Sequence, residues 1–188
     1  GRTVSHNLGS VPGMIIIKGT NSNVEWGVYH RGIDQTGTAP EDWYAWLNYS
    51  FARGNNAGYW NDTAPTSTEF TLGNNGNVNP AAGGTFVAYI FAHNDGDGEF
   101  GPDSDQDIIK CGVYAGNSDS NGPEINLGFE PQFVMIRNAG WSNGQFIMYD
   151  SMRGLATGTG GDQLLYPAQN YAESPDTQIR ATSTGFKL

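Results

Sequence analysis

The feature that most constrains the fold of this chain is an internal repeat. Residues 7–12, NLGSVP, share the spacing of Asn, Leu, Gly and Pro with residues 126–131, NLGFEP. Three further blocks recur in the same order: MIIIK at 14–18 with FVMIR at 133–137, WGVY at 26–29 with FIMY at 146–149, and TSTEFTL at 66–72 with TSTGFKL at 182–188. A repeat of this length predicts two diverged tandem copies of one domain-sized unit.

Each copy has the pattern of a small β structure. Its apolar runs are short and bounded by Gly and Pro, which is typical of strands buried on both faces. A polar loop, residues 19–23 in one copy and 138–144 in the other, separates the first two runs and predicts a hairpin. We expect a third strand near 43–47 and near 164–166, and a fourth at 70–72 and 186–188.

The segment between the copies carries two further apolar runs, residues 85–92 and 108–114, which we expect to be strands. We therefore divide the chain into a first β unit at 1–83, linking strands with an acidic loop at 84–123, and a second, truncated β unit at 124–188. Only the first copy is followed by a strand like 85–92. The second is expected to leave an open sheet edge, which a longer parent chain or a neighbouring chain would cover.

Composition favours turns and strands over helices. Gly accounts for 27 of 188 residues and charged residues for only 15%, while aromatic residues reach 12% and can fill a core. No segment keeps a 3.6-residue apolar period over three turns. The sequence therefore predicts an all-β fold, a β-sandwich or jelly roll, with little helix.

Charge and hydropathy exclude several classes of partner. The net charge is −10, and no basic stripe is present to displace counterions, so we expect no binding to nucleic acid. The longest apolar runs, 14–17 and 86–92, are too short to span a bilayer, so we expect no membrane insertion. The single cysteine, Cys111, cannot form an intrachain disulfide, and its apolar surroundings predict a buried, inert thiol.

Several blocks together resemble a known domain. They are residues 5–18, 60–67, 87–93, 108–117 and 126–131. They resemble a domain of tail-fibre-like structural proteins of marine bacteriophages, cyanophages especially. The resemblance implies a virion-surface, extracellular protein that acts in adsorption or particle assembly. It implies no catalytic residues, and because the family pattern continues beyond both ends, it predicts that this chain is a fragment.

An acidic loop is the strongest candidate for a metal site. Asp95 and Asp97 alternate with other residues along residues 93–107, as do Asp103, Asp105 and Asp107. Calcium prefers six to eight hard oxygen ligands, so this pattern suggests a calcium site. The spacing of an EF-hand is absent, and the alternative is a solvated loop with Asx-type turns.

Aromatic residues are candidates for stacking on sugar rings. Tyr59, Trp60, Asn61 and Asp62 lie in a Gly- and Asn-rich stretch, where binding groups usually project, and are the candidate glycan contacts. Four more aromatic residues are weaker candidates, because burial in the core of a sandwich explains them as well: Trp43, Tyr44, Trp46 and Tyr49.

We therefore predict a non-catalytic protein that adheres to host-surface glycan, as a homo-oligomer or together with other virion proteins. The first alternative is a purely architectural role, such as a capsid decoration or a self-assembling filament. The second is a polysaccharide-degrading enzyme, which would need two convergent carboxylates. Asp150 beside Arg153 suggests a structural ion pair or turn former rather than an acid catalyst.

Overall fold

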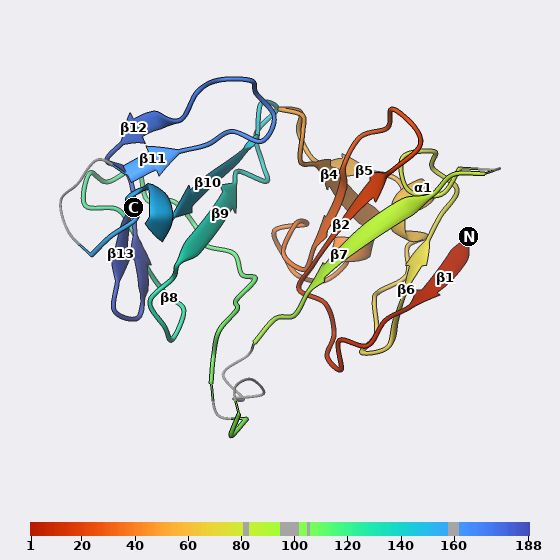
Figure 1. The fold of residues 1–188 in the computed structure, drawn as a ribbon, viewed down its shortest axis with the longest axis horizontal. Helices are drawn as coiled ribbons and strands as arrows, with labels where there is room; N and C mark the ends of the chain where they lie inside the picture. Colours follow the sequence, from red (N-terminus) through yellow and green to blue (C-terminus); the bar gives the residue numbers. More distant parts are fainter. Residues whose placement is uncertain (81–82, 95–101, 105, 158–161) are drawn as a thin grey trace. The chain divides into compact units, whose positions relative to one another are not determined.

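The computed structural model describes residues 1–80, 83–94, 102–104, 106–157 and 162–188. It confirms an all-β fold with little helix, built from several antiparallel sheets (Figure 1). The chain divides into two compact units. Unit 1 comprises Gly1–His93, Ile109–Gly112 and Asn138–Gln145, and unit 2 comprises Asn94–Ile108, Val113–Arg137 and Phe146–Leu188.

Unit 1 contains two antiparallel sheets. The larger has the strand order β5-β4-β3-β2-β7, and β1 pairs with β6 in the smaller. The strands are β1 (Arg2–Ser5), β2 (Met14–Gly19), β3 (Gly27–His30), β4 (Trp43–Trp46), β5 (Gly54–Asn55), β6 (Glu69–Leu72) and β7 (Phe86–Phe91). A 3-10 turn, η1 (Pro40–Asp42), precedes β4, and a one-turn helix, α1 (Ala57–Trp60), follows β5.

The core of unit 1 joins both of its sheets. Ile15, Ile17 and Tyr29 come from the larger sheet, and Phe70 and Leu72 come from β6. They form one buried cluster with the rings of α1, so the two sheets pack over a common interior in the manner of a sandwich.

Unit 2 is built from smaller sheets. The strand β14 lies between β13 and β8, while β9 pairs with β10 and β11 pairs with β12. The elements are β8 (Glu124–Asn126), β9 (Phe133–Arg137), β10 (Phe146–Asp150), η2 (Ser151–Arg153), β11 (Asp162–Leu164), β12 (Ser174–Asp176), β13 (Arg180–Thr182) and β14 (Gly185–Lys187). A bridge between Met148 and Leu165 connects β10 to the chain just after β11.

The core of unit 2 again draws on several sheets. Val134 of β9, Tyr149 of β10, Leu164 of β11 and Phe186 of β14 belong to one buried cluster, with Ile179 fully buried among them. Unit 2 therefore has an interior of its own.

The predicted hairpins form in both units, and their registers correspond. Ile15 lies opposite Tyr29 in the β2–β3 hairpin, and Val134 lies opposite Tyr149 in the β9–β10 hairpin. These are the positions that the recurring sequence blocks align. In both units the strand that precedes the hairpin also pairs with the last strand of the recurring blocks, β1 with β6 and β8 with β14.

Two expectations for residues 84–123 are corrected. The predicted strand at 85–92 forms as β7, but it pairs with β2 over six positions and completes the sheet of unit 1 instead of linking the copies. Within the described residues, 108–114 form no strand. Ile108 and Val113 expose their side chains, so this apolar run does not line a buried face as a sheet strand would.

The model has no helix, among its described residues, that is both long and apolar enough to cross a membrane.

Candidate functional site

The rings of Tyr59 and Trp60 are buried, which corrects the prediction that they project as glycan contacts. The side chain of Asn56 caps α1 by accepting a hydrogen bond from the Gly58 amide at 2.7 Å, and the helical turn directs both rings into the core. The Tyr59 hydroxyl accepts a hydrogen bond from Trp46 Nε1 at 2.6 Å. Trp60 Nε1 donates to the Trp43 carbonyl at 3.0 Å, so both polar ends are used internally.

Asn61 and Asp62 are exposed, as a contact residue requires, but they serve to end α1. Both have left-handed backbones, with φ of 56° and 46°. The Asn61 amide closes the helix by donating to the Ala57 carbonyl at 2.8 Å. Asn61 and Asp62 therefore follow two buried rings, and not an exposed ring on which a sugar could stack.

A different set of aromatic residues reaches the surface of unit 1. We call Trp46, Tyr49 and Phe51 the aromatic platform. The rings of Tyr49 and Phe51 lie parallel, with centroids 5.1 Å apart and an interplanar angle of 7°. Tyr49 is 42% exposed and Phe51 is 54% exposed, and Trp46 meets both rings edge-on at 5.8 and 6.0 Å. Large exposed rings clustered in this way mark interaction surfaces.

The core holds the platform in place. Trp46 packs at 5.5 Å against Tyr44, whose ring stacks on Tyr59 at 3.7 Å. The Trp46 indole also donates to the Tyr59 hydroxyl, so a continuous aromatic row runs from the core to the surface. Because these rings are already ordered, a ligand that stacks on them loses little affinity to ordering entropy.

Polar side chains fix the turn that carries the platform. Asn48, between Trp46 and Tyr49, accepts a hydrogen bond from the Trp26 amide at 3.0 Å and donates to the Glu25 carboxylate at 2.5 Å. Asn77 in turn accepts from the Glu25 amide at 3.2 Å. Asn48 therefore places a polar side chain next in sequence to the exposed Tyr49 ring, and a ligand with both apolar faces and hydroxyl groups suits this combination.

Trp43 does not join this surface, because the Arg53 guanidinium lies over its ring at 4.2 Å from the centroid. Of the weaker candidates, Trp43 and Tyr44 therefore serve in packing, and Trp46 and Tyr49 lie in the platform.

Sequence reasoning missed Phe51 and Trp141. Trp141 is 72% exposed on a loop of unit 1, where Asn138 Oδ1 accepts hydrogen bonds from the amides of Gly140 at 2.9 Å and Trp141 at 3.1 Å. The sequence feature that could have identified Trp141 is its position between Gly140 and Ser142 in a turn-rich stretch. The feature for Phe51 is its position just after the strand predicted near 43–47.

The acidic loop is only partly described. Asp95, Asp97 and Asp105 lie outside the described residues, and Asp103 is exposed. Within the part that the structure describes, Asp107 Oδ1 is buried without a hydrogen-bond partner, and no three His, Cys, Asp or Glu side chains gather to hold a metal ion. The calcium site stays a prediction.

Cys111 is buried in unit 1, as predicted. Its Sγ contacts the Ala92 carbonyl at 3.6 Å, and its amide donates to His93 Nδ1 at 3.0 Å. Burial raises the pKa of the thiol to about 11, with a small opposing effect of Arg31, so the reactive thiolate is scarce at neutral pH.

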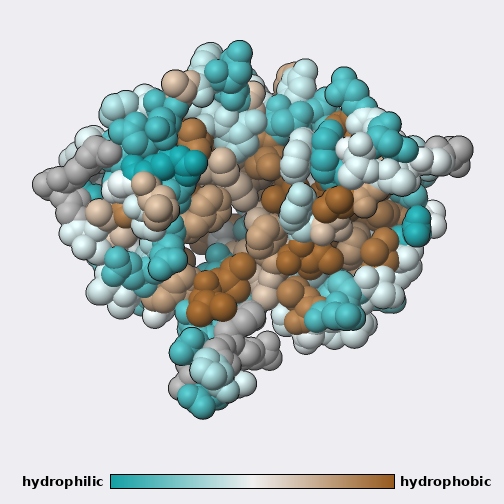
Figure 2. All heavy atoms as spheres, in the orientation of Figure 1, coloured by the Kyte–Doolittle hydropathy of each residue, from teal (hydrophilic) through white to brown (hydrophobic). Residues whose placement is uncertain are grey.

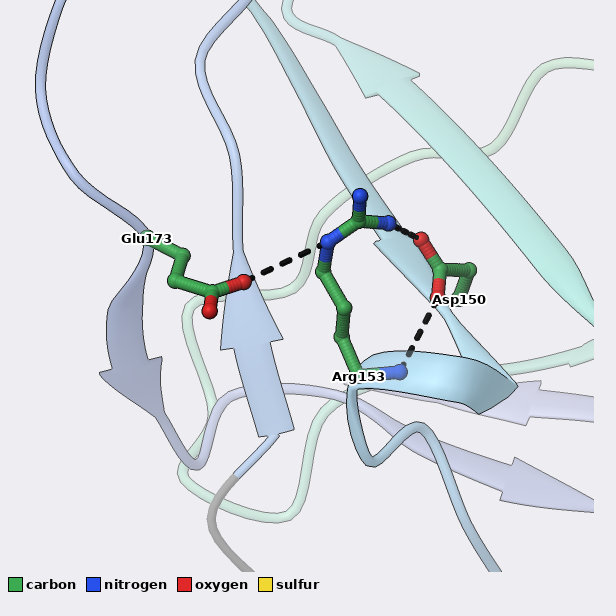
Figure 3. Close-up of polar contacts among 3 residues, drawn as sticks. All are labelled: Asp150, Arg153 and Glu173. Atoms are coloured by element: carbon green, nitrogen blue, oxygen red, sulfur yellow. Dashed lines mark hydrogen bonds and ion pairs between the residues drawn. The ribbon is translucent and has the colours of Figure 1, made fainter.

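Two acidic groups of unit 2 are structural. Asp150 caps η2 by accepting from the Arg153 amide at 3.0 Å and forms an ion pair with the Arg153 guanidinium, which also meets Glu173 at 3.3 Å (Figure 3). This confirms the predicted ion pair and turn former.

A second pair of carboxylates lies opposite in β11 and β12, where Asp162 faces Asp176. Asp176 accepts hydrogen bonds from the Tyr149 hydroxyl and from the amides of Thr177 and Gln178, so its oxygens are occupied. Asp162 is buried, and its burial together with the charge of Asp176 raises its pKa. The hydrogen bond from Tyr149 to Asp176 joins β10 to β12.

The model of one protein family, described as Domain of unknown function (DUF7483), matches residues 1–188. No curated protein and no solved structure matches the chain significantly.

Proposed function

The chain belongs to the DUF7483 family, and we propose that it is a non-catalytic domain that binds carbohydrate through the aromatic platform. The observation that carries this proposal is the parallel, exposed pair of rings, Tyr49 and Phe51. Sugar rings have apolar C–H faces that stack on aromatic rings and hydroxyl edges that bond to amides and carboxylates. The platform and the turn around Asn48 offer both kinds of contact.

Charge narrows the class of carbohydrate. The chain carries a net charge of −10, and Glu25 lies in the network that holds the platform. Repulsion therefore disfavours sulfated, phosphorylated or uronic polysaccharides, and the proposed ligand is a neutral glycan.

We place this activity on a virion surface, in a tail-fibre-like structural protein that attaches a phage to its host. The support for this placement is the resemblance carried by residues 5–18, 60–67, 87–93, 108–117 and 126–131. Single platforms of this size bind weakly. The proposed mechanism of adhesion is therefore the simultaneous use of many weak sites on one particle.

We also infer that units 1 and 2 are diverged copies of one ancestral unit. The support is the shared register of the β2–β3 and β9–β10 hairpins at aligned sequence blocks. Among the described residues of unit 2, the exposed Tyr171 stacks on no second ring, so a parallel exposed pair such as Tyr49 and Phe51 occurs in unit 1 alone. The proposed carbohydrate site therefore belongs to unit 1 alone.

The first prediction tests the platform directly. Replacing Tyr49 or Phe51 with Ala should weaken binding to neutral host-surface polysaccharide about three- to tenfold each, because each ring contributes about 1 kcal/mol of stacking. The measurement is affinity electrophoresis or a glycan array with the purified chain.

Tyr171→Ala is the matched control, since Tyr171 is an exposed tyrosine of unit 2 outside the platform. Equal binding by the Tyr49→Ala variant and the unaltered chain would contradict the proposal. So would an equal loss in the Tyr171→Ala variant.

A further inference from the structure

Strand β7 leaves one side of its backbone unpaired in unit 1. It is the last strand of the five-stranded sheet and pairs with β2 along its whole length (Figure 1). Val87, Ala88 and Tyr89 are all exposed, although neighbouring side chains in a strand point to opposite faces. Within the part of the chain that the structure describes, no strand pairs with the side of β7 that faces away from β2.

The hydrogen bonds of β7 show which groups face the open edge. The carbonyls of Thr85 and Phe91 accept from amides on the β2 side, at Thr20 and Gly13, at 2.8 and 2.9 Å. Because backbone groups alternate in direction along an antiparallel strand, the odd-numbered residues bond to β2. The amides and carbonyls of Phe86, Ala88 and Ile90 therefore point away from the sheet.

This edge lacks the devices by which proteins usually prevent strand pairing. The strand reads FVAYIF, with no charged residue and no Pro, and its register with β2 continues without a bulge. Figure 2 shows hydrophobic side chains over this part of the molecule, and Val87 and Tyr89 are 42% and 47% exposed. Long, flat and apolar edges of this kind pair with other strands.

We propose that β7 is an assembly site, at which two copies of this chain pair antiparallel through their β7 edges. The partner at this edge is a second copy of the chain, because the β7 edge can pair with another β7 edge. A twofold axis normal to the sheet places two β7 strands antiparallel with their cores on the same side, and the two five-stranded sheets become one. A chain of net charge −10 repels its copies in general, but its uncharged β7 adds no repulsion at the contact.

The alternation of backbone groups restricts the register, because the outward-facing residues must form the hydrogen-bonded pairs. Of the registers that this allows, the proposed one is centred on Ala88, which lies opposite Ala88 of the second copy. Val87 then lies opposite the second copy's Tyr89 in a close, non-hydrogen-bonded pair. Aromatic and β-branched partners are a favourable pair on one face of a sheet. Tyr89 is already held by its ring contact with Trp26, at 6.4 Å between centroids.

A second edge competes for the same role. Within the described residues, β9 pairs with β10 alone and exposes Phe133. However, β9 carries the charged Arg137, and a charged residue on an edge strand disfavours pairing, so the uncharged β7 is the better match for itself.

The second prediction tests the edge. The purified chain should show a concentration-dependent mass that rises to twice that of one chain in sedimentation equilibrium. Val87→Lys should shift the chain to the monomer at every concentration measured, because a lysine on an edge strand blocks pairing. Hydrogen exchange at the amides of Ala88 and Ile90 should slow with concentration in the unaltered chain.

Val113→Lys is the matched control, since Val113 is an exposed valine outside β7 and gains the same charge. A monomeric unaltered chain, or a dimer that survives Val87→Lys, would overturn the proposal. A dimer abolished by Met135→Lys in β9 but not by Val87→Lys would assign assembly to the other edge. Loss of carbohydrate binding in the platform variants leaves this result unchanged, so the two proposals fail separately.

Discussion

At the scale of single residues, His30 couples the stability of unit 1 to pH. Its Nδ1 accepts a hydrogen bond from the Gly32 amide at 3.1 Å, which requires an unprotonated nitrogen. Burial, together with the charges of His93 and Arg31, lowers the pKa of His30 to about 4. The unfolded chain protonates His30 near the usual pKa of about 6.5. The stabilisation is therefore complete above that pH and is lost as the pH falls toward 4.

The third prediction follows from this coupling. Between about pH 7.5 and about pH 5 the titration of His30 should remove about 2 kcal/mol from the free energy of unfolding. His30→Asn keeps an acceptor for the Gly32 amide and should remove that part of the pH dependence, measured by urea unfolding at both pH values. His6→Asn is the control, because His6 Nδ1 accepts from the Leu8 amide in the same way. An unchanged pH dependence in His30→Asn would contradict the assignment.

Residue-level chemistry was only partly predictable from sequence. The Asp150–Arg153 pair could be predicted because its two residues are neighbours in the chain. Cys111 was predicted to be buried from its apolar run, but its contacts are with Ala92 and His93, which are distant in sequence. Tyr59 and Trp60 could not, since a Gly- and Asn-rich stretch predicts a turn without showing which way its side chains point. The Asn56 cap decides that direction, and it turns both rings inward.

At the scale of elements, close backbone approach fixes the pairing of β14 with β8. Gly185 lies opposite Asn126, and a Cβ at Gly185 would stand 1.9 Å from the Ile125 carbonyl oxygen. The aligned residue of unit 1 is Glu69 in β6, which carries a side chain. The two strand pairs therefore approach each other differently despite their similar sequences.

The fourth prediction is that Gly185→Ala destabilises unit 2 by about 2–3 kcal/mol, because the new methyl group collides with backbone that cannot rotate away. Gly116→Ala is the matched control in unit 2, since nothing lies within 4 Å of a Cβ there. Thermal unfolding of both variants measures the difference. Equal melting temperatures would show that β8 and β14 separate easily.

Hairpins were the elements that sequence predicted best. Two apolar runs around a short polar loop can pair locally, and both pairs form. The run at 108–114 has the same local composition, but strand formation depends on a partner elsewhere in the chain. For β7 that partner is β2, more than sixty residues earlier, which explains why it joins unit 1.

At the scale of the whole molecule, the two proposed surfaces reinforce each other. The platform is formed by Trp46 at the end of β4 and by Tyr49 and Phe51 after it, and the assembly edge is β7 at the far edge of the same sheet. A dimer formed through β7 carries two platforms, so a polymeric glycan that reaches both binds with avidity.

The fifth prediction separates avidity from intrinsic affinity. Val87→Lys should weaken retention on an immobilised polysaccharide by about tenfold or more while leaving the affinity for a free oligosaccharide unchanged. Surface retention and calorimetry of the same preparations give the two numbers, with Val113→Lys again as the control. Parallel losses in both assays would mean that the substitution damages the platform itself.

The recurring blocks predicted two copies of one unit, and this stays a proposal, with the aligned hairpin positions as its support. The boundaries were harder to predict, because unit 1 includes Ile109–Gly112 and Asn138–Gln145, segments that lie beyond its own stretch of chain. The sequence alone could not show that these two segments belong to unit 1, because their placement depends on tertiary contacts.

The buried position of Cys111 has a practical consequence. The chain has no other cysteine, and this thiol is both inaccessible and poorly ionised at neutral pH. A cysteine introduced at an exposed position outside both proposed surfaces, such as Met152 or Tyr171, would therefore be the one thiol that maleimide dyes modify in the folded protein. A fluorophore at either position can follow glycan binding or subunit association without prior removal of the native cysteine.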